Sequence, residues 1–177
     1  MTDTPFPAPV LGRPGQAYEA SRLRWAGLRD AQRLAALRAL AYPDTAADGH
    51  TVRAGLEHGG ALLLEDRTGD LLAALCWRDH KDGWEVERVA TLPAHRGQGY
   101  GRWLMTRVEA AAIRANVPTL TLPLPLDTTR EQLAYYARMG YTEAARDDTS
   151  ITLHKRVGGT WQTKVPGSGG GRLGAPT

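Results

Sequence analysis

A glycine-rich turn restricts the local fold of this chain more than any other segment does. An apolar run that ends at Leu92 is broken by Pro93, and glycines then recur at positions 97, 99 and 101, directly before a predicted helix. Because glycine has no Cβ, its backbone can approach a ligand closely. The unpaired N–H groups and the dipole of a helix N-terminus favour an anion at the same place. The segment therefore predicts a strand, a phosphate-binding turn and a helix, or else a glycine-rich turn that only allows tight packing.

The apolar periodicity on both sides of this turn predicts an α/β domain built around one mixed sheet. Leucines at helical spacing are followed by two apolar runs separated by the turn DRTGD, and such runs indicate a hairpin. The expected strands are residues 23–27, 61–65, 71–78, 84–92, 119–126, 141–146 and 150–156. The expected helices are residues 30–42, 51–58, 101–115 and 128–139, the last ended by Gly140.

Composition and charge exclude several classes of protein. Apolar residues make up 42% and charged residues 23%, which is typical of a soluble globular chain. The single Cys76 has no internal disulfide partner, and we see neither a signal peptide nor a membrane-spanning run, so we expect a cytoplasmic protein. The 22 basic and 19 acidic residues leave the body nearly neutral, which argues against a nucleic-acid partner. The five histidines lack metal-ligand spacing, so we expect no metal.

Proline and glycine mark the expected limits of the domain. Residues 1–21 predict an irregular N-terminal arm, and residues 158–177 have the composition of a linker. We therefore expect the folded domain over residues 22–157. Trp161 in the tail is either an anchor that docks on this domain or a solvent-facing aromatic residue.

The glycine turn matches neither of the two common nucleotide motifs. Its spacing is G-x-G-x-G without a following acid, so it fails the dinucleotide fingerprint, and it also lacks the P-loop pattern. What remains, Arg96-x-x-Gly99-x-Gly101, resembles the [RQ]-x-x-G-x-[GA] signature of the Gcn5-related N-acetyltransferase (GNAT) family. The segment AYYARMGY, with Tyr136 four residues before Gly140, is similar to the second motif of that family. The resemblance covers about residues 21–156 and includes the order of the elements.

This resemblance implies an acyl-CoA N-acyltransferase fold, in which a mixed, centrally splayed sheet is flanked by helices. It implies acetyl transfer from acetyl-CoA to the amine of a small-molecule or peptide acceptor, without a metal or a membrane, and it is compatible with a homodimer. A non-catalytic acyl-CoA-binding sensor of the same fold is the alternative. The residues implied for the coenzyme are the strand edge Val89, Ala90 and Thr91, the loop Arg96, Gly97, Gln98, Gly99, Tyr100, Gly101 and Arg102, and Thr129, which stands where many members have asparagine.

Acetyl transfer to an amine needs a base for the amine and an acid for the departing thiolate. Tyr136 resembles the tyrosine acid of the family, although an aromatic residue packed at a helix end is the alternative. Glu85, Glu87 and Val89 alternate in sequence and are expected to share one face of a strand. Family members place the base at either glutamate register, and we favour Glu87 because it lies nearer the thioester end. Surface pairing of these glutamates with Arg78 or Arg88 is the alternative.

Two prolines give independent evidence for a splayed sheet. Pro123 and Pro125 are two residues apart, so both missing N–H donors belong to the same edge of the strand at 119–126. An edge that faces a cleft tolerates this loss, whereas a paired edge does not. We therefore expect the strands at 84–92 and 119–126 to separate beyond Thr121. The alternatives are that the prolines lie in a loop, or that their edge faces the strand at 150–156 and breaks the pairing there.

Overall fold

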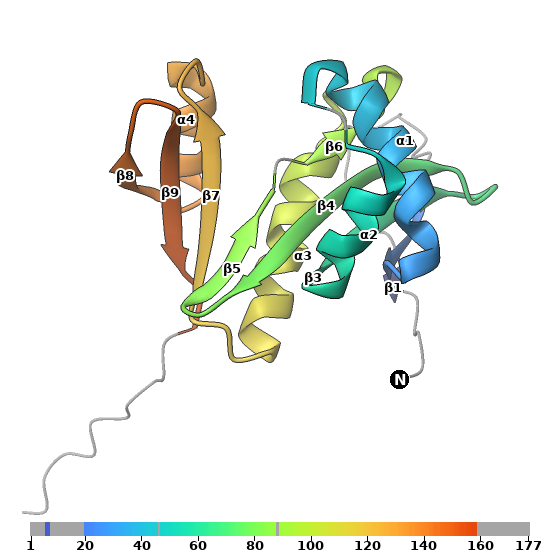
Figure 1. Cartoon of the computed structure of the whole chain (residues 1–177), viewed down its shortest axis with the longest axis horizontal. Coiled ribbons are helices and arrows are strands. Elements are labelled where there is room, and N and C mark those ends of the chain that lie inside the picture. The colour runs from blue at the N-terminus through green and yellow to red at the C-terminus, as the bar shows by residue number, and fades with distance from the viewer. Residues whose placement is uncertain (1–5, 8–19, 46, 88, 159–177) are drawn as a thin grey trace, which may run out of the picture.

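An open, twisted sheet runs through the described part of the chain, which comprises residues 6–7, 20–45, 47–87 and 89–158 of this computed structural model (Figure 1). The strands are β1 (Phe6–Pro7), β2 (Ala20–Trp25), β3 (Gly59–Asp66), β4 (Leu71–His80), β5 (Gly83–Val86), β6 (Ala90–Thr91), β7 (Thr119–Pro125), β8 (Thr142–Arg146) and β9 (Ser150–Arg156). Their order is β1-β2-β3-β4-β5-β7-β9-β8, with β6 paired to β4. Only the described pair β5–β7 is parallel, so the predicted mixed sheet is confirmed.

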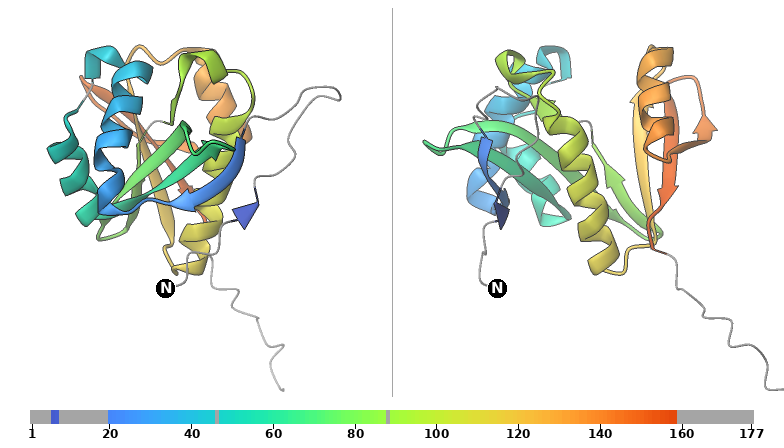
Figure 2. Two further views of the ribbon diagram at one scale, coloured as in Figure 1. Left: turned by 90° about the vertical axis from the view of Figure 1, so that its right-hand side faces the viewer. Right: turned by 180° about the vertical axis from the view of Figure 1, so that it is seen from behind.

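Helices cover both faces of this sheet. They are α1 (Ala31–Ala41), α2 (Gly49–Glu57), α3 (Tyr100–Arg114) and α4 (Arg130–Arg138), and short 3-10 turns lie at Leu28–Asp30, Pro43–Thr45 and Pro93–His95. Figure 2 shows α3 and α4 on the face opposite α1 and α2. In β3, Leu62 and Leu64 pack toward α3, while Ala61 and Leu63 pack toward α1 and α2. Both faces are buried, which explains why β3 is a continuous apolar run.

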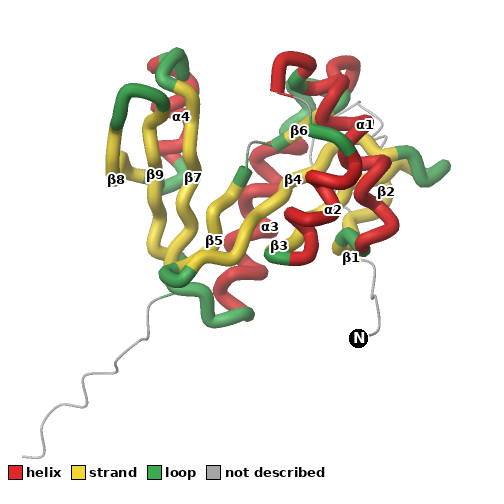
Figure 3. Tube along the Cα trace, in the orientation of Figure 1, coloured by secondary structure: helices red, strands yellow, loops and turns green. Residues whose placement is uncertain are grey.

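The sheet is splayed between β5 and β7, as the two prolines predicted. The parallel pairing is restricted to Trp84↔Leu120 and Glu85↔Thr121, after which the strands diverge (Figure 3). On its other side β7 pairs with β9 along its whole length. The carbonyl of Pro118 accepts a hydrogen bond from the Val157 N–H, which fixes the even-numbered residues of β7 as those that bond to β9. The missing donors of Pro123 and Pro125 therefore face the gap.

The strand predicted at residues 84–92 is wrong as one continuous element, because a β-bulge divides it into β5 and β6. Val86 lies opposite Trp77 and Ala90 opposite Ala74, so one additional residue is inserted in this strand. The bulge reverses the faces: Val86 packs under α3, whereas Ala90 packs under α1 and α2. Val89 likewise packs toward α3 and does not share the face of Glu87. Alternation in a sequence predicts a common face only while the ladder is regular.

Several other elements begin at residues different from those predicted, for local reasons. The arm expected to be irregular contains β1, which pairs with β2, and the remainder of that arm lies outside the described residues, as does the tail with Trp161. The helix expected from residue 128 begins at Arg130, because Thr129 and Gln132 form a capping box. Gly140 has φ +89°, the left-handed conformation that was expected after the helix end.

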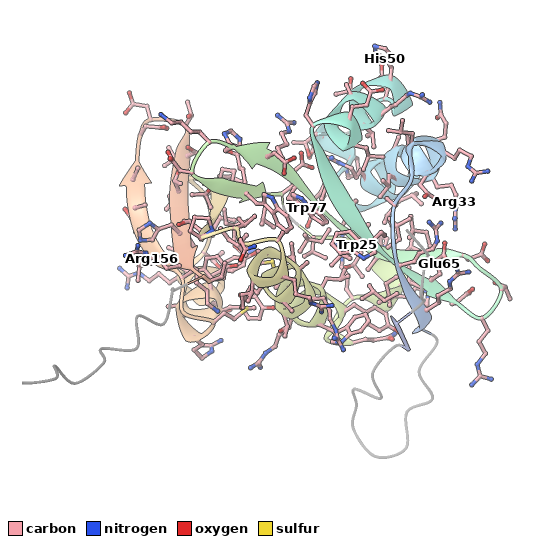
Figure 4. All side chains as sticks on the ribbon, turned by 90° about the horizontal axis from the view of Figure 1, so that it is seen from below. Trp25, Arg33, His50, Glu65, Trp77 and Arg156 are labelled. Atoms are coloured by element: carbon pink, nitrogen blue, oxygen red, sulfur yellow. The ribbon has the colours of Figure 1, made fainter. Side chains whose placement is uncertain are left out.

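A buried ion cluster joins β2, β3 and the start of α1. Arg24 Nη2 lies 2.6 Å from Asp30 Oδ1 and 2.8 Å from Glu65 Oε1, and Arg33 Nη1 lies 3.0 Å from the same Glu65 oxygen. Figure 4 shows Arg33 and Glu65 on the same side of the molecule. The hydrogen bond from Arg24 lowers the pKa of Asp30 against the effect of burial. Burial acts to raise the pKa of Glu65, but the two arginines outweigh it and the pKa is lowered.

These lowered pKa values predict a loss of stability in acid. Both carboxyl groups bind protons more readily in the unfolded chain than in the folded protein. Their contribution to the free energy of unfolding is therefore complete above an ordinary carboxyl pKa of about 4, and it is lost as the pH falls through the folded pKa values. Urea unfolding between pH 7 and pH 3 should show this decline. Replacing Arg24 with methionine should cost about 3 kcal/mol at pH 7 and flatten the acid dependence. An unchanged acid dependence in Arg24→Met would contradict this assignment.

Candidate active site

The glycine turn forms an open loop at the N-terminus of α3. Gly97 and Gly99 have φ values of +77° and +84°, and Gly99 is the N-cap of the helix. A Cβ built at either glycine would meet no atom within 4 Å. Both glycines are therefore required by backbone conformation, because L side chains rarely adopt a positive φ. The loop presents its backbone to open space at the positive end of a helix of 15 residues.

A cavity of about 400 Å³ lies against this loop. It brings together most residues that the sequence assigned to the coenzyme, namely Val89, Thr91, Arg96, Gly97, Gly99, Tyr100, Gly101 and Arg102. Ala90 is buried beneath α1, and Gln98 and Thr129 lie outside the lining of this cavity. Thr129 caps α4 through its hydroxyl group, which is a structural role.

A second cavity of about 520 Å³ lies where β5 and β7 have separated. Tyr136 lines it together with Leu124 and Pro125 of β7. Val89 and Tyr135 line both cavities, so the loop and the gap form one continuous cleft. The ring of Tyr136 packs edge-on against Tyr135, with a centroid distance of 5.2 Å. The sequence-predicted acid thus lies in the same cleft as the glycine loop.

The structure places Glu87 in a different pocket, on the α1 and α2 side of the sheet. Its side chain is 19% exposed, and Oε2 lies 2.5 Å from Arg38 Nη1 while Oε1 lies 3.4 Å from Arg78 Nη2. Glu85 lies on the same face farther from the bulge, and its carboxylate is 3.6 Å from His80 Nε2. Glu87 and Tyr136 therefore approach the splayed region from opposite faces of the sheet and do not share a cavity.

The last turn of α1 contacts both the Glu87 pocket and the cleft beside the glycine loop. Sequence analysis did not predict these contacts. Arg38 binds Glu87, and Tyr42, four residues later, donates a hydrogen bond of 2.6 Å to the carbonyl of Val89. Arg96 of the glycine loop donates to the carbonyl of Ala41 at 2.8 Å. The i, i+4 spacing of Arg38 and Tyr42 places them on one helix face, which was the available signal. Nothing in the sequence indicated what that face contacts.

The remaining reactive side chains fit structural roles. Burial raises the pKa of the Cys76 thiol to about 12, and the charge of Glu87 adds to this rise, so the group is a thiol at neutral pH. Burial also raises the pKa of Tyr135, whereas the charge of Arg102 acts to lower it. In the described ranges no group of three His, Cys, Asp or Glu side chains is placed to hold a metal ion. The helices described are all too short or too polar to cross a membrane.

Comparison with known proteins identifies the family. The model of the acetyltransferase (GNAT) domain matches residues 57–143. S-alkylcysteine N-acetyltransferase from Bacillus subtilis (strain 168) is 33% identical over 130 residues, which cover 64% of this chain and 71% of the relative. The chain therefore belongs to the GNAT family and is an acyltransferase, as the two sequence motifs predicted.

Solved structures confirm the fold. The ribosomal-protein-S18-alanine N-acetyltransferase from Escherichia coli superimposes with a TM-score of 0.70 at 17% identity, over 80% of this chain and 96% of that chain. A GNAT family N-acetyltransferase from Escherichia coli in complex with CoA gives a TM-score of 0.66 at 18% identity, over 83% and 86% of the two chains. The acyl-CoA N-acyltransferase fold expected from the sequence is thus confirmed.

Proposed function

We propose that this protein transfers an acetyl group from acetyl-CoA to a primary amine. The separation of β5 and β7 beyond Thr121 is the observation that supports this most directly, because β6 then has an edge that can accept a ligand as an additional strand. The pantetheine arm would pair with that edge at Val89 and Thr91. The amides of residues 97–102 would hold the pyrophosphate at the N-terminus of α3. The CoA complex of a structural neighbour supports the choice of this ligand.

The proposed chemistry assigns one proton transfer to each face of the sheet. An acceptor amine with a pKa of about 10 arrives protonated, so Glu87, acting through a water molecule, removes a proton before the nitrogen attacks. The C–N bond forms at the thioester carbonyl and the C–S bond breaks, while Tyr136 donates its hydroxyl proton to the departing sulfur. The second amine proton then leaves the nitrogen and, through solvent, restores the Tyr136 hydroxyl group, while the proton held by Glu87 is released. The products are the N-acetyl compound, CoA as a thiol and one released proton.

A comparison of two glutamate variants tests which carboxylate is the base. We expect Glu87→Gln to lower kcat by about 100-fold, at the lower limit for a general base, because the amide cannot accept the proton. Glu85→Gln, on the same face and two residues earlier in the chain, should change kcat by less than about threefold. Release of the CoA thiol at saturating acetyl-CoA measures both values. The reverse order of the two effects would reassign the base to Glu85.

One observation favours a second function, a module that binds acyl-CoA without turnover. Glu87 is already engaged by Arg38 and Arg78, so an acceptor amine must compete with two guanidinium groups. Saturable acetyl-CoA binding without thiol release, across a panel of amines, amino acids and peptides, would support that module. Release of CoA that depends on an added amine would support the transferase.

A further inference from the structure

The carboxylate proposed as the base lies between two arginines. Arg38 and Arg78 contact different oxygen atoms of Glu87, at 2.5 and 3.4 Å. Glu85 lies directly opposite Arg78 in the β4–β5 pair and on the same face, so these two arginines and two glutamates together carry no net charge. Selection between amines therefore rests on the guanidinium groups themselves, which can pair with a carboxylate beside the acceptor amine.

The two arginines differ in how freely they can bind a ligand. The side chain of Arg38 is 27% exposed and lies close to Glu87, so its role is to position that carboxylate. The side chain of Arg78 is 55% exposed, and its contact with Glu87 is the longer one. Guanidinium presents a fork of donors that matches a carboxylate in a bidentate manner. Arg78 is therefore the better placed to bind a second carboxylate at the pocket entrance.

The pocket around Glu87 is small and has an apolar wall. Its volume is about 50 Å³, and Val52 and Leu56 of α2 together with Cys76 of β4 form the apolar part of its lining. This lining suits a short aliphatic or thioether group and excludes a long cationic chain.

We propose that the acceptor is a free α-amino acid with a small apolar side chain, and that Arg78 binds its α-carboxylate while its amine faces Glu87. The inference rests on the proposed acetyl transfer. A protein N-terminus offers the same α-amine, but its neighbouring carbonyl is an uncharged amide. A simple amine or polyamine lacks the carboxylate altogether. The amino acid is thus the acceptor that satisfies both the base and the arginine.

A matched set of acceptors tests this inference on the unmodified protein. The set contains L-alanine, L-valine and S-methyl-L-cysteine, the amide and the decarboxylated amine of each, a dipeptide that begins with each, and spermidine. Thiol release and product mass give kcat/KM for each compound. We expect at least one free amino acid to exceed its amide and its amine by about 10- to 100-fold, the contribution of hydrogen bonds to a charged group.

The outcomes separate this inference from the proposed function. If an amide, an amine, a dipeptide or spermidine is acetylated as efficiently as the free amino acids, the inference is overturned but the proposed acetyl transfer is supported. Absence of CoA release with every compound contradicts both. Preference for a free amino acid over its amide supports the inference, because the two differ only in the carboxylate.

A pair of arginine variants assigns the preference to one residue. Arg78→Gln should raise KM for the preferred amino acid by about 10- to 100-fold, leave KM for acetyl-CoA unchanged, and bring the ratio of amino acid to amide toward one. Arg53→Gln is the control, because Arg53 is also exposed and paired with a glutamate but lies on α2 outside the pocket lining. A purely structural Arg78 would reduce turnover of all acceptors alike and keep the ratio, which would overturn its assignment.

Discussion

Replacing Tyr136 with phenylalanine is expected to lower kcat by about 100- to 10,000-fold, the usual contribution of a general acid or base. The ring would keep its edge-on packing against Tyr135 and its place in the hydrophobic core, so the fold and the cleft should persist. Only the proton donor for the departing sulfur is removed. KM for acetyl-CoA should therefore change little. Steady-state thiol release, with acetyl-CoA binding measured by calorimetry, separates these two effects.

Tyr141 offers the matched control for this variant. Its ring centroid lies 6.1 Å from that of Tyr136, it is 2% exposed, and its hydroxyl group donates to Glu109 outside the cleft. Tyr141→Phe removes the same atom and should cost about 1 kcal/mol of stability through the lost hydrogen bond, with kcat within about twofold. Equal kcat in Tyr136→Phe and the wild type would make Tyr136 a packing residue.

Replacing Gly99 with valine is the second change expected to have a large effect, namely the loss of acetyl-CoA binding. A saturating coenzyme concentration of about 100 times Kd should add about 2.7 kcal/mol to the stability of the wild-type protein. Valine at a φ of +84° is strained, and its branched side chain would occupy the open space above the loop. The backbone of residues 97–102 would then be closed to a pyrophosphate group. Thermal unfolding with and without acetyl-CoA measures the loss.

Gly69 allows the strain to be separated from the binding effect. It has a φ of +90°, and a Cβ there also meets no atom within 4 Å, but it lies in the turn between β3 and β4. Gly69→Val should lower the melting temperature by a similar amount and keep the full response to acetyl-CoA. If Gly99→Val also kept that response, the loop would not be the coenzyme site.

The parts of the fold that sequence analysis predicted correctly are those governed by local chemistry. Pro123 and Pro125 lack donors whatever the tertiary structure, so one edge without these donors was evident in advance, but the neighbouring strand that this edge faces was not. Gly97 and Gly99 likewise require a conformation that few residues adopt. The bulge after Val86 was missed because alternation in sequence does not reveal one inserted residue, which depends on how β4 pairs with this strand.

In the candidate site, too, sequence analysis predicted the features that depend on local sequence and missed those that depend on tertiary packing. Sequence analysis predicted the conformation of the glycine loop and the common face of Glu85 and Glu87, because motif spacing and strand alternation are short-range signals, but it wrongly placed Val89 on that face. It missed Arg38, which meets Glu87 across 49 residues of sequence. It did name Arg78 as an alternative partner for the glutamates, and the structure places Arg78 against Glu87. Contacts between α1 and the bulge depend on tertiary packing, which one sequence without relatives does not reveal.

The last turn of α1 joins the two halves of the site mechanically. Its side chains and its terminal carbonyl contact the proposed base, the strand edge at Val89 and the glycine loop through Arg96. A displacement of this turn would alter the acceptor pocket and the donor cleft together. Affinities for the two substrates are then linked quantities: whatever factor the donor imposes on acceptor binding, the acceptor must impose on donor binding. One helical turn would thus set the degree of cooperativity between the two substrates.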